Sequence, residues 1–178
     1  MKKANQKRFL RALVVCIGLC AATASKAHLM KAQHGTLNFK DDGVYMVLSL
    51  PASVFTAADE NNDKLLSSDE FSKNRVDITK MIQQSITLGT DKKRRFLQGI
   101  MLNPETPDDS PNSPAPNIVV LGKFLPIETQ SQLDFNIDIY ANNLALPSIE
   151  ITASRKSEGL SQVIEISAAH PAATLNIQ

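Results

Sequence analysis

Cysteine is scarce in this 178-residue chain, and both copies, Cys16 and Cys20, lie near the N-terminus. The rest of the chain therefore offers no disulfide, no thiolate metal site and no cysteine nucleophile. Motifs of common active sites are also missing: the chain has no G-x-S-x-G, no H-E-x-x-H and no glycine-rich loop that cradles phosphate. These absences predict a protein that is not an enzyme.

Long apolar runs are missing too, apart from one near the N-terminus. Residues 12–22 are apolar and follow a basic start, but the run is too short to span a bilayer as a helix. Small residues come next, so we expect a signal peptide over residues 1–27, cleaved after Ala24 or after Ala27. The sequence thus predicts an exported bacterial protein, periplasmic or extracellular, with one domain over 28–178 and no transmembrane segment after signal removal.

Basic residues are in the minority once the signal is set aside. Residues 28–178 carry 13 Lys and Arg against 18 Asp and Glu, a net charge of −5. Such a charge argues against a nucleic-acid partner, whose phosphates need neutralising by basic side chains. It favours the binding of cations.

Most of the chain after the signal has the patterns of β-strands. In QLDFNIDIYA, residues 132–141, every second residue is apolar, which is typical of a strand with one buried face. Asp41-Asp42-Gly43 is a good hairpin turn. The expected strands cover residues 36–39, 43–50, 85–90, 94–102, 117–124, 132–141, 149–154, 161–167 and 173–178. We therefore predict a mainly β, antiparallel sandwich-like domain.

Two segments interrupt the strand pattern. Between about 53 and 84 the apolar period becomes helical, since Phe71, Ile78 and Ile82 can share one face with Met81. Residues 103–116 hold five of the nine prolines and no large apolar residue, which predicts an extended surface loop.

The helical segment contains a run of oxygen-bearing residues, DENNDKLLSSDE, at 59–70. Calcium takes several oxygen ligands, and a twelve-residue loop supplies them from positions 1, 3, 5, 7, 9 and 12. Here these positions are Asp59, Asn61, Asp63, the carbonyl of Leu65, Ser67 and Glu70. Ser67 and Glu70 also have the spacing of a capping box, which indicates that a helix begins here.

This stretch resembles an EF-hand loop, with Phe55 before it and Phe71 after it at positions typical of that family. The resemblance covers about residues 54–81 and implies an inserted helix–loop–helix that binds one Ca²⁺. Lys64 stands where the family has glycine, so its backbone is expected to be left-handed. A single loop without this glycine predicts weak affinity, on the order of 10⁻⁴ to 10⁻³ M, and a structural role for the ion.

Two alternatives remain open at this stage. If cleavage follows Ala27, the amine and imidazole of a terminal His28 can chelate copper, with His34 or Met30 as a further ligand. The export signal and the acidic β-rich module also show a resemblance to the extracytoplasmic part of HupE/UreJ-type membrane proteins. That resemblance implies an accessory module of a membrane metal transporter. The sequence identifies no particular protein partner.

Overall fold

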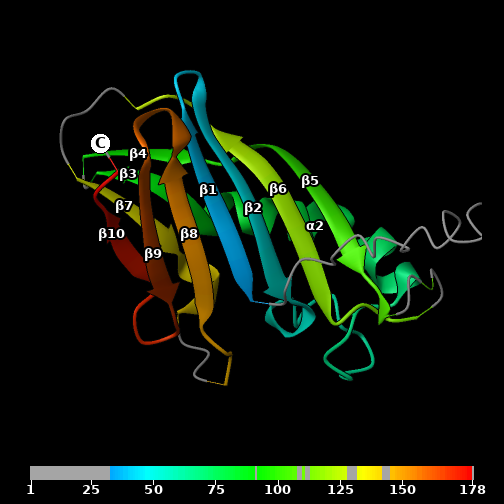
Figure 1. Ribbon diagram of the computed structural model, residues 1–178. Helices are drawn as coiled ribbons and strands as arrows, with labels where there is room; N and C mark the ends of the chain where they lie inside the picture. The colour runs from blue at the N-terminus through cyan, green and yellow to red at the C-terminus, as the bar shows by residue number, and fades with distance from the viewer. Residues whose placement is uncertain are drawn as a thin grey trace, which may run out of the picture.

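The computed structural model of the chain describes residues 33–90, 92–107, 110, 113–127, 132–141 and 145–177. Within these ranges the chain forms two β-sheets and one α-helix (Figure 1). The expected signal peptide, His28 and Met30 lie outside the described residues.

The larger sheet has six strands in the order β5-β6-β2-β1-β8-β9. Their bounds are β1 (His34–Lys40), β2 (Gly43–Pro51), β5 (Gln98–Glu105), β6 (Asn117–Phe124), β8 (Ile149–Arg155) and β9 (Leu160–Ile166). All neighbouring pairs are antiparallel except β1 and β8, which are parallel. This one pair therefore departs from the antiparallel arrangement that the sequence predicts. Turn signals predict hairpins between consecutive strands, and they carry no information about strands far apart in the chain.

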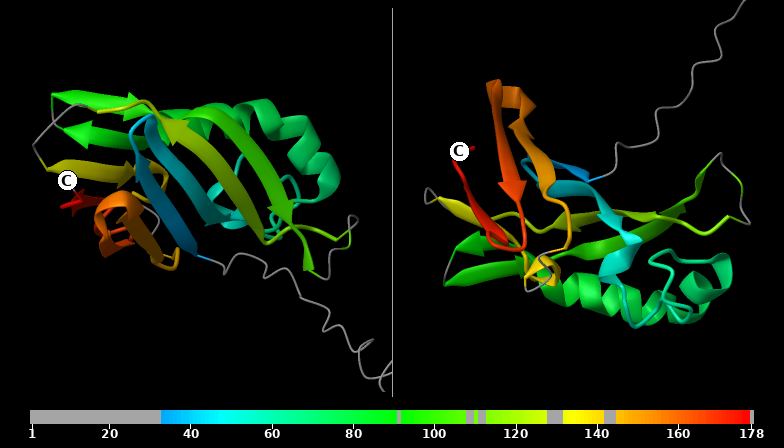
Figure 2. Two further views of the ribbon diagram at one scale, coloured as in Figure 1. Left: turned by 45° about the horizontal axis from the view of Figure 1, so that its top comes forward. Right: turned by 90° about the horizontal axis from the view of Figure 1, so that it is seen from below.

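The smaller sheet has four strands in the order β10-β7-β3-β4. Their bounds are β3 (Ile86–Thr90), β4 (Lys93–Phe96), β7 (Leu133–Ile137) and β10 (Ala172–Leu175). Helix α2 (Ser68–Ser85) leads directly into β3. Figure 2 shows α2 and the smaller sheet on the same side of the larger sheet. No helix in the described ranges is long and apolar enough to cross a membrane.

Apolar side chains fill the space between these layers. Buried and less buried residues alternate along β1, as expected for a strand with one covered face. On α2 the buried residues include Phe71, Ile78 and Ile82, which confirms the predicted helical spacing. The rings of Phe124 in β6 and Phe135 in β7 meet edge to face with centroids 6.3 Å apart, so the two sheets share one core. The mainly β, sandwich-like fold is thus confirmed.

Residues 94–102, predicted as one strand, form parts of two. β4 ends at Phe96 in the smaller sheet, and β5 begins at Gln98 in the larger sheet. The residue between them, Leu97, is fully buried against Gly122, where an added Cβ would lie 2.6 Å from Leu97 Cγ. The chain changes sheets at Leu97, and an unbroken run of strand-forming residues gives no sign of such a change.

Two further segments differ from the sequence prediction. The strand predicted over 132–141 ends at Ile137, because Asp138–Tyr140 form the 3₁₀ turn η3. The predicted surface loop at 103–116 begins inside β5, whose place at the edge of the larger sheet tolerates proline. Near its other end, Ala115 is fully buried.

Candidate metal centre

The loop at 59–70 lies between the end of β2 and the start of α2. β2 ends at Pro51, and Ala52–Val54 form the 3₁₀ turn η1. One further turn follows, in which the amide of Ala58 donates to the carbonyl of Phe55 (2.8 Å). The first α-helix of the predicted helix–loop–helix is therefore replaced by these two turns. The stretch from Pro51 to the loop is described in full, and it is too short for a stable α-helix.

Side chains of alternate residues point to the inside of the curled loop. Asp59 is buried, and its Oδ1 and Oδ2 accept hydrogen bonds from the amides of Asp63 (3.2 Å) and Lys64 (2.8 Å). Asn61 Oδ1 also accepts from the Asp63 amide (3.0 Å), and Asn61 Nδ2 donates to Asp63 Oδ2 (3.0 Å). Asp63 Oδ1 accepts from the amide of Leu65 (2.8 Å). The alternate spacing seen in the sequence thus becomes one connected network.

The backbone of Lys64 is left-handed, with φ of 66°. This conformation was predicted from the glycine position of the EF-hand loop, and the φ angle bears it out. It costs a residue with a Cβ roughly 1–2 kcal/mol relative to glycine. Asn62, with φ of 58°, shares the conformation, and asparagine is a residue type that tolerates it.

Glu70 joins the two ends of the loop. Its carboxylate is buried, and Oε1 accepts from the amide of Glu60 (2.9 Å). Oε2 accepts from both the amide (2.9 Å) and the hydroxyl (2.7 Å) of Ser67, whose Oγ accepts from the Glu70 amide (3.2 Å). The predicted capping box is therefore present at the start of α2. The hydrogen bonds from Ser67 hold the pKa of the Glu70 carboxyl below its ordinary value, so the group is ionised at neutral pH.

The eighth loop residue, Leu66, pairs with a distant segment. Its amide donates to the carbonyl of Ala115 (3.0 Å), and the Ala115 amide donates back to the Leu66 carbonyl (2.7 Å). Both residues are almost fully buried. Sequence reasoning missed Ala115 because it lies among prolines, which predict a solvated loop. The only available signal was its lone apolar side chain between Pro114 and Pro116.

The donor atoms of the loop are of the kind that Ca²⁺ prefers. Carboxylates, an amide, a hydroxyl and a backbone carbonyl come from Asp59, Asp63, Glu70, Asn61, Ser67 and Leu65. The carboxylate oxygens, however, already accept hydrogen bonds from amide and hydroxyl groups of the protein. In the described part of the chain, no three His, Cys, Asp or Glu side chains gather as a group that could hold a metal ion. Glu70 Oε2 already accepts two hydrogen bonds, so bidentate contact with a cation requires the Ser67 hydroxyl to turn away.

His34 is the one residue of the predicted copper set that the structure describes. It begins β1, and its Nδ1 lies 3.4 Å from Oε1 of Glu150, its cross-strand partner in β8. Since His28 and Met30 lie outside the described residues, the copper arrangement stays a prediction.

Comparison with known proteins gives no match to a family model and none to a curated protein. The assignment of the loop therefore rests on the residues and contacts of this chain.

Proposed function

We propose that this chain is an exported, non-enzymatic binding protein whose loop at 59–70 binds one Ca²⁺. The observation that carries the proposal is the position of Asp59 and Glu70. These two carboxylates begin and end the loop, both are 8% exposed, and the amide next to Asp59, that of Glu60, donates to Glu70 Oε1. The hydrogen bond from Glu60 thus joins the two ends of the loop beside both acids, and carboxylate oxygens are ligands that calcium prefers.

The remaining oxygen donors support the same reading. Asn61 and Asp63 are hydrogen-bonded to each other within the loop, next to the left-handed backbone of Lys64. In the bound state Ser67 exchanges one role for another. Its hydroxyl stops donating to Glu70 Oε2 and offers its oxygen to the ion, directly or through water. Breaking this hydrogen bond lowers the affinity, which agrees with the weak, structural site expected from the sequence.

The test compares Glu70→Gln with Glu60→Gln. Both variants lose one carboxylate of the loop, but Glu60 is exposed and pairs with Lys73 on the surface. We expect titration calorimetry to show calcium binding in wild type and in Glu60→Gln, and at least a tenfold weaker affinity in Glu70→Gln. Calcium at ten times its dissociation constant should stabilise wild type by about 1.4 kcal/mol in thermal melting. Equal affinities in Glu70→Gln and wild type would sink the assignment.

Export belongs to the same proposal and has its own test. Mass spectrometry of the protein recovered from the periplasm or medium should show the loss of residues 1–24 or 1–27. Intact Met1 on exported protein contradicts the signal-peptide assignment. A mature start at Ser25 removes the copper alternative, which requires a terminal His28. The transporter-module alternative predicts co-purification with a membrane protein.

A further inference from the structure

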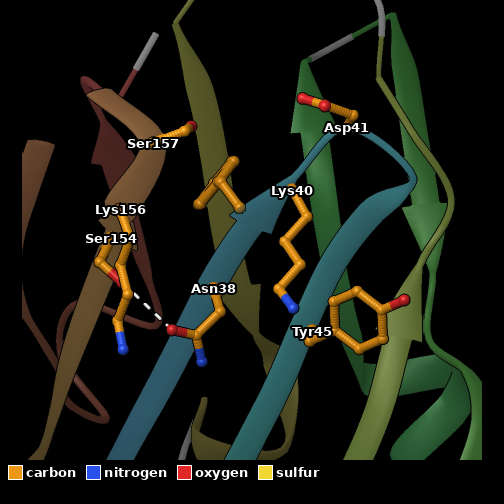
Figure 3. Close-up of a pocket in the computed structure, with 8 residues that line it drawn as sticks. Asn38, Lys40, Asp41, Tyr45, Ser154, Lys156 and Ser157 are labelled. Atoms are coloured by element: carbon orange, nitrogen blue, oxygen red, sulfur yellow. Dashed lines mark hydrogen bonds between the residues drawn. The ribbon is translucent and has the colours of Figure 1, made fainter. Parts of the chain in front are cut away.

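A pocket of about 640 Å³ lies on the larger sheet, and it includes no residue of the calcium loop. It is formed where the end of the β1–β2 hairpin faces the end of β8 and the 3₁₀ turn η4 (Lys156–Glu158). Figure 3 shows the polar side chains that line it. The ones that matter here are those of Asn38, Lys40, Tyr45, Ser154, Lys156 and Ser157.

Two of these side chains are cations without an anionic partner. Among the described residues, no carboxylate lies within the 4.0 Å of an ion pair from the amine of Lys40 or of Lys156. Lys123 nearby is different, because its amine is 2.7 Å from Asp42 Oδ2. Two positive charges on opposite sides of one pocket attract anions to it.

The neutral side chains add hydrogen-bond donors between the two lysines. The hydroxyl of Ser154 donates to Asn38 Oδ1 (3.2 Å), and Asn38 Nδ2 donates to Thr36 Oγ1 over a longer 3.5 Å. The second hydrogen of the Asn38 amide group can still donate to a ligand. In Figure 3 the side-chain nitrogens of Lys156, Asn38 and Lys40 form a row across β8 and β1. The hydroxyl of Ser157 is a further donor on the rim.

Other groups around the pocket limit what can bind. Lys40 also lies 5.4 Å from the ring centroid of Tyr45, which orients its amine over the sheet. Asp41 is the one acidic residue that lines the pocket. Figure 3 shows it at the hairpin turn, beyond Lys40, whose amine points away from it. A group with several negatively charged oxygens can therefore reach both lysines without meeting the Asp41 carboxylate.

We propose that this pocket binds a small anionic molecule through a carboxylate or phosphate group. The amines of Lys40 and Lys156 and the amide of Asn38 donate to its oxygens, as charge-assisted hydrogen bonds favour. The pocket is open to solvent and combines apolar surface from Phe39 and Tyr45 with a few convergent donors, as is common for small-molecule sites. This site is independent of the calcium loop.

The test titrates the full mature chain with inorganic phosphate, with glucuronate and with neutral glucose, followed by NMR or calorimetry. The buffer is freed of calcium on a chelating resin, because calcium phosphate precipitates and a soluble chelator is itself a carboxylate. We expect saturable binding of phosphate, of glucuronate or of both, weaker at high salt, and none of glucose. The tighter of the two anions identifies the ligand group.

Variants locate the binding. Lys40→Gln and Lys156→Gln should each weaken it several-fold, and the double variant by about tenfold or more. Lys80→Gln is the control, since it removes the same charge from an exposed position on α2, where the Lys80 amine lies 3.4 Å from Asp77 Oδ1. All three lysine side chains are on the surface, so circular dichroism should show unchanged folds. The proposal is overturned if neither anion saturates, or if Lys80→Gln weakens binding as much as Lys156→Gln does.

Discussion

Leu66 and Ala115 form an isolated two-residue β-bridge, in which each backbone amide donates to the carbonyl of the other. Leu66 belongs to the loop at 59–70 and Ala115 to the proline-rich segment before β6. Because both residues are buried, this bridge ties the loop to the larger sheet through β6. A loop held at its eighth residue is fixed to the body of the domain as well as by its own hydrogen bonds.

The bridge can be tested with Ala115→Pro. Proline removes the amide that donates to the Leu66 carbonyl and leaves that carbonyl buried without a partner, which costs about 1–3 kcal/mol. We expect a lower melting temperature, weaker calcium binding and faster hydrogen exchange at the Leu66 amide. Ala115→Gly is the control, because it loses the methyl group but keeps the amide and should keep the Leu66 amide protected. Slow exchange in Ala115→Pro would show that the bridge is not needed.

Strain at Lys64 gives a second prediction. Lys64→Gly should relieve the left-handed backbone and stabilise the protein by about 1 kcal/mol, measured by denaturant unfolding. Lys64→Gln keeps the Cβ and removes the charge, so it should change stability by only a few tenths of a kcal/mol. Asn62→Gly is the matched control at φ of 58°, with a smaller gain because asparagine tolerates this conformation. A glycine at 64 that improves neither stability nor calcium affinity would contradict the strained turn.

Glu105 at the end of β5 predicts a dependence of stability on pH. Its Oε2 is buried with no hydrogen-bond partner in the described structure, and burial raises the pKa of the carboxyl above 4.5. The folded protein therefore disfavours the ionised form, and stability is lost as pH rises from 4.5 through the folded pKa.

Glu105→Gln should remove that loss. We expect a higher melting temperature at neutral pH and no gain at about pH 3. The free energy of unfolding at neutral pH should rise by at most about 1 kcal/mol, because the carboxyl is only partly buried. Glu158→Gln, at a more exposed carboxylate, is the control and should not change the pH profile in this way. An identical gain at both pH values would assign the effect to packing rather than to ionisation.

Tyr140 gives a prediction about the core. Its side chain is fully buried, its hydroxyl has no hydrogen-bond partner among the described residues, and burial raises its pKa. Tyr140→Phe should therefore be neutral or stabilising by up to about 1 kcal/mol in denaturant unfolding. Tyr45→Phe is the control, since that hydroxyl donates to Asp42 and its loss should give no gain. A clear destabilisation by Tyr140→Phe would mean that the hydroxyl has a partner.

Much of the local structure follows from the sequence because its causes lie within a few residues. The alternation in β1, the helical spacing of Phe71, Ile78 and Ile82, and the capping box of Ser67 and Glu70 are each set by neighbours in the chain. The left-handed turn at Lys64 is predicted in another way, from the resemblance of the loop to an EF-hand loop with glycine at this position.

Other features depend on contacts between segments that are distant in the chain. The parallel pairing of β1 with β8, the change of sheet at Leu97 and the bridge between Leu66 and Ala115 leave no repeating pattern in the sequence. The pocket between Lys40 and Lys156 exists only because that same parallel pairing places β1 beside β8. Periodicity and capping report which surfaces an element must bury, whereas the choice of the partner that buries them is made by packing of the whole chain.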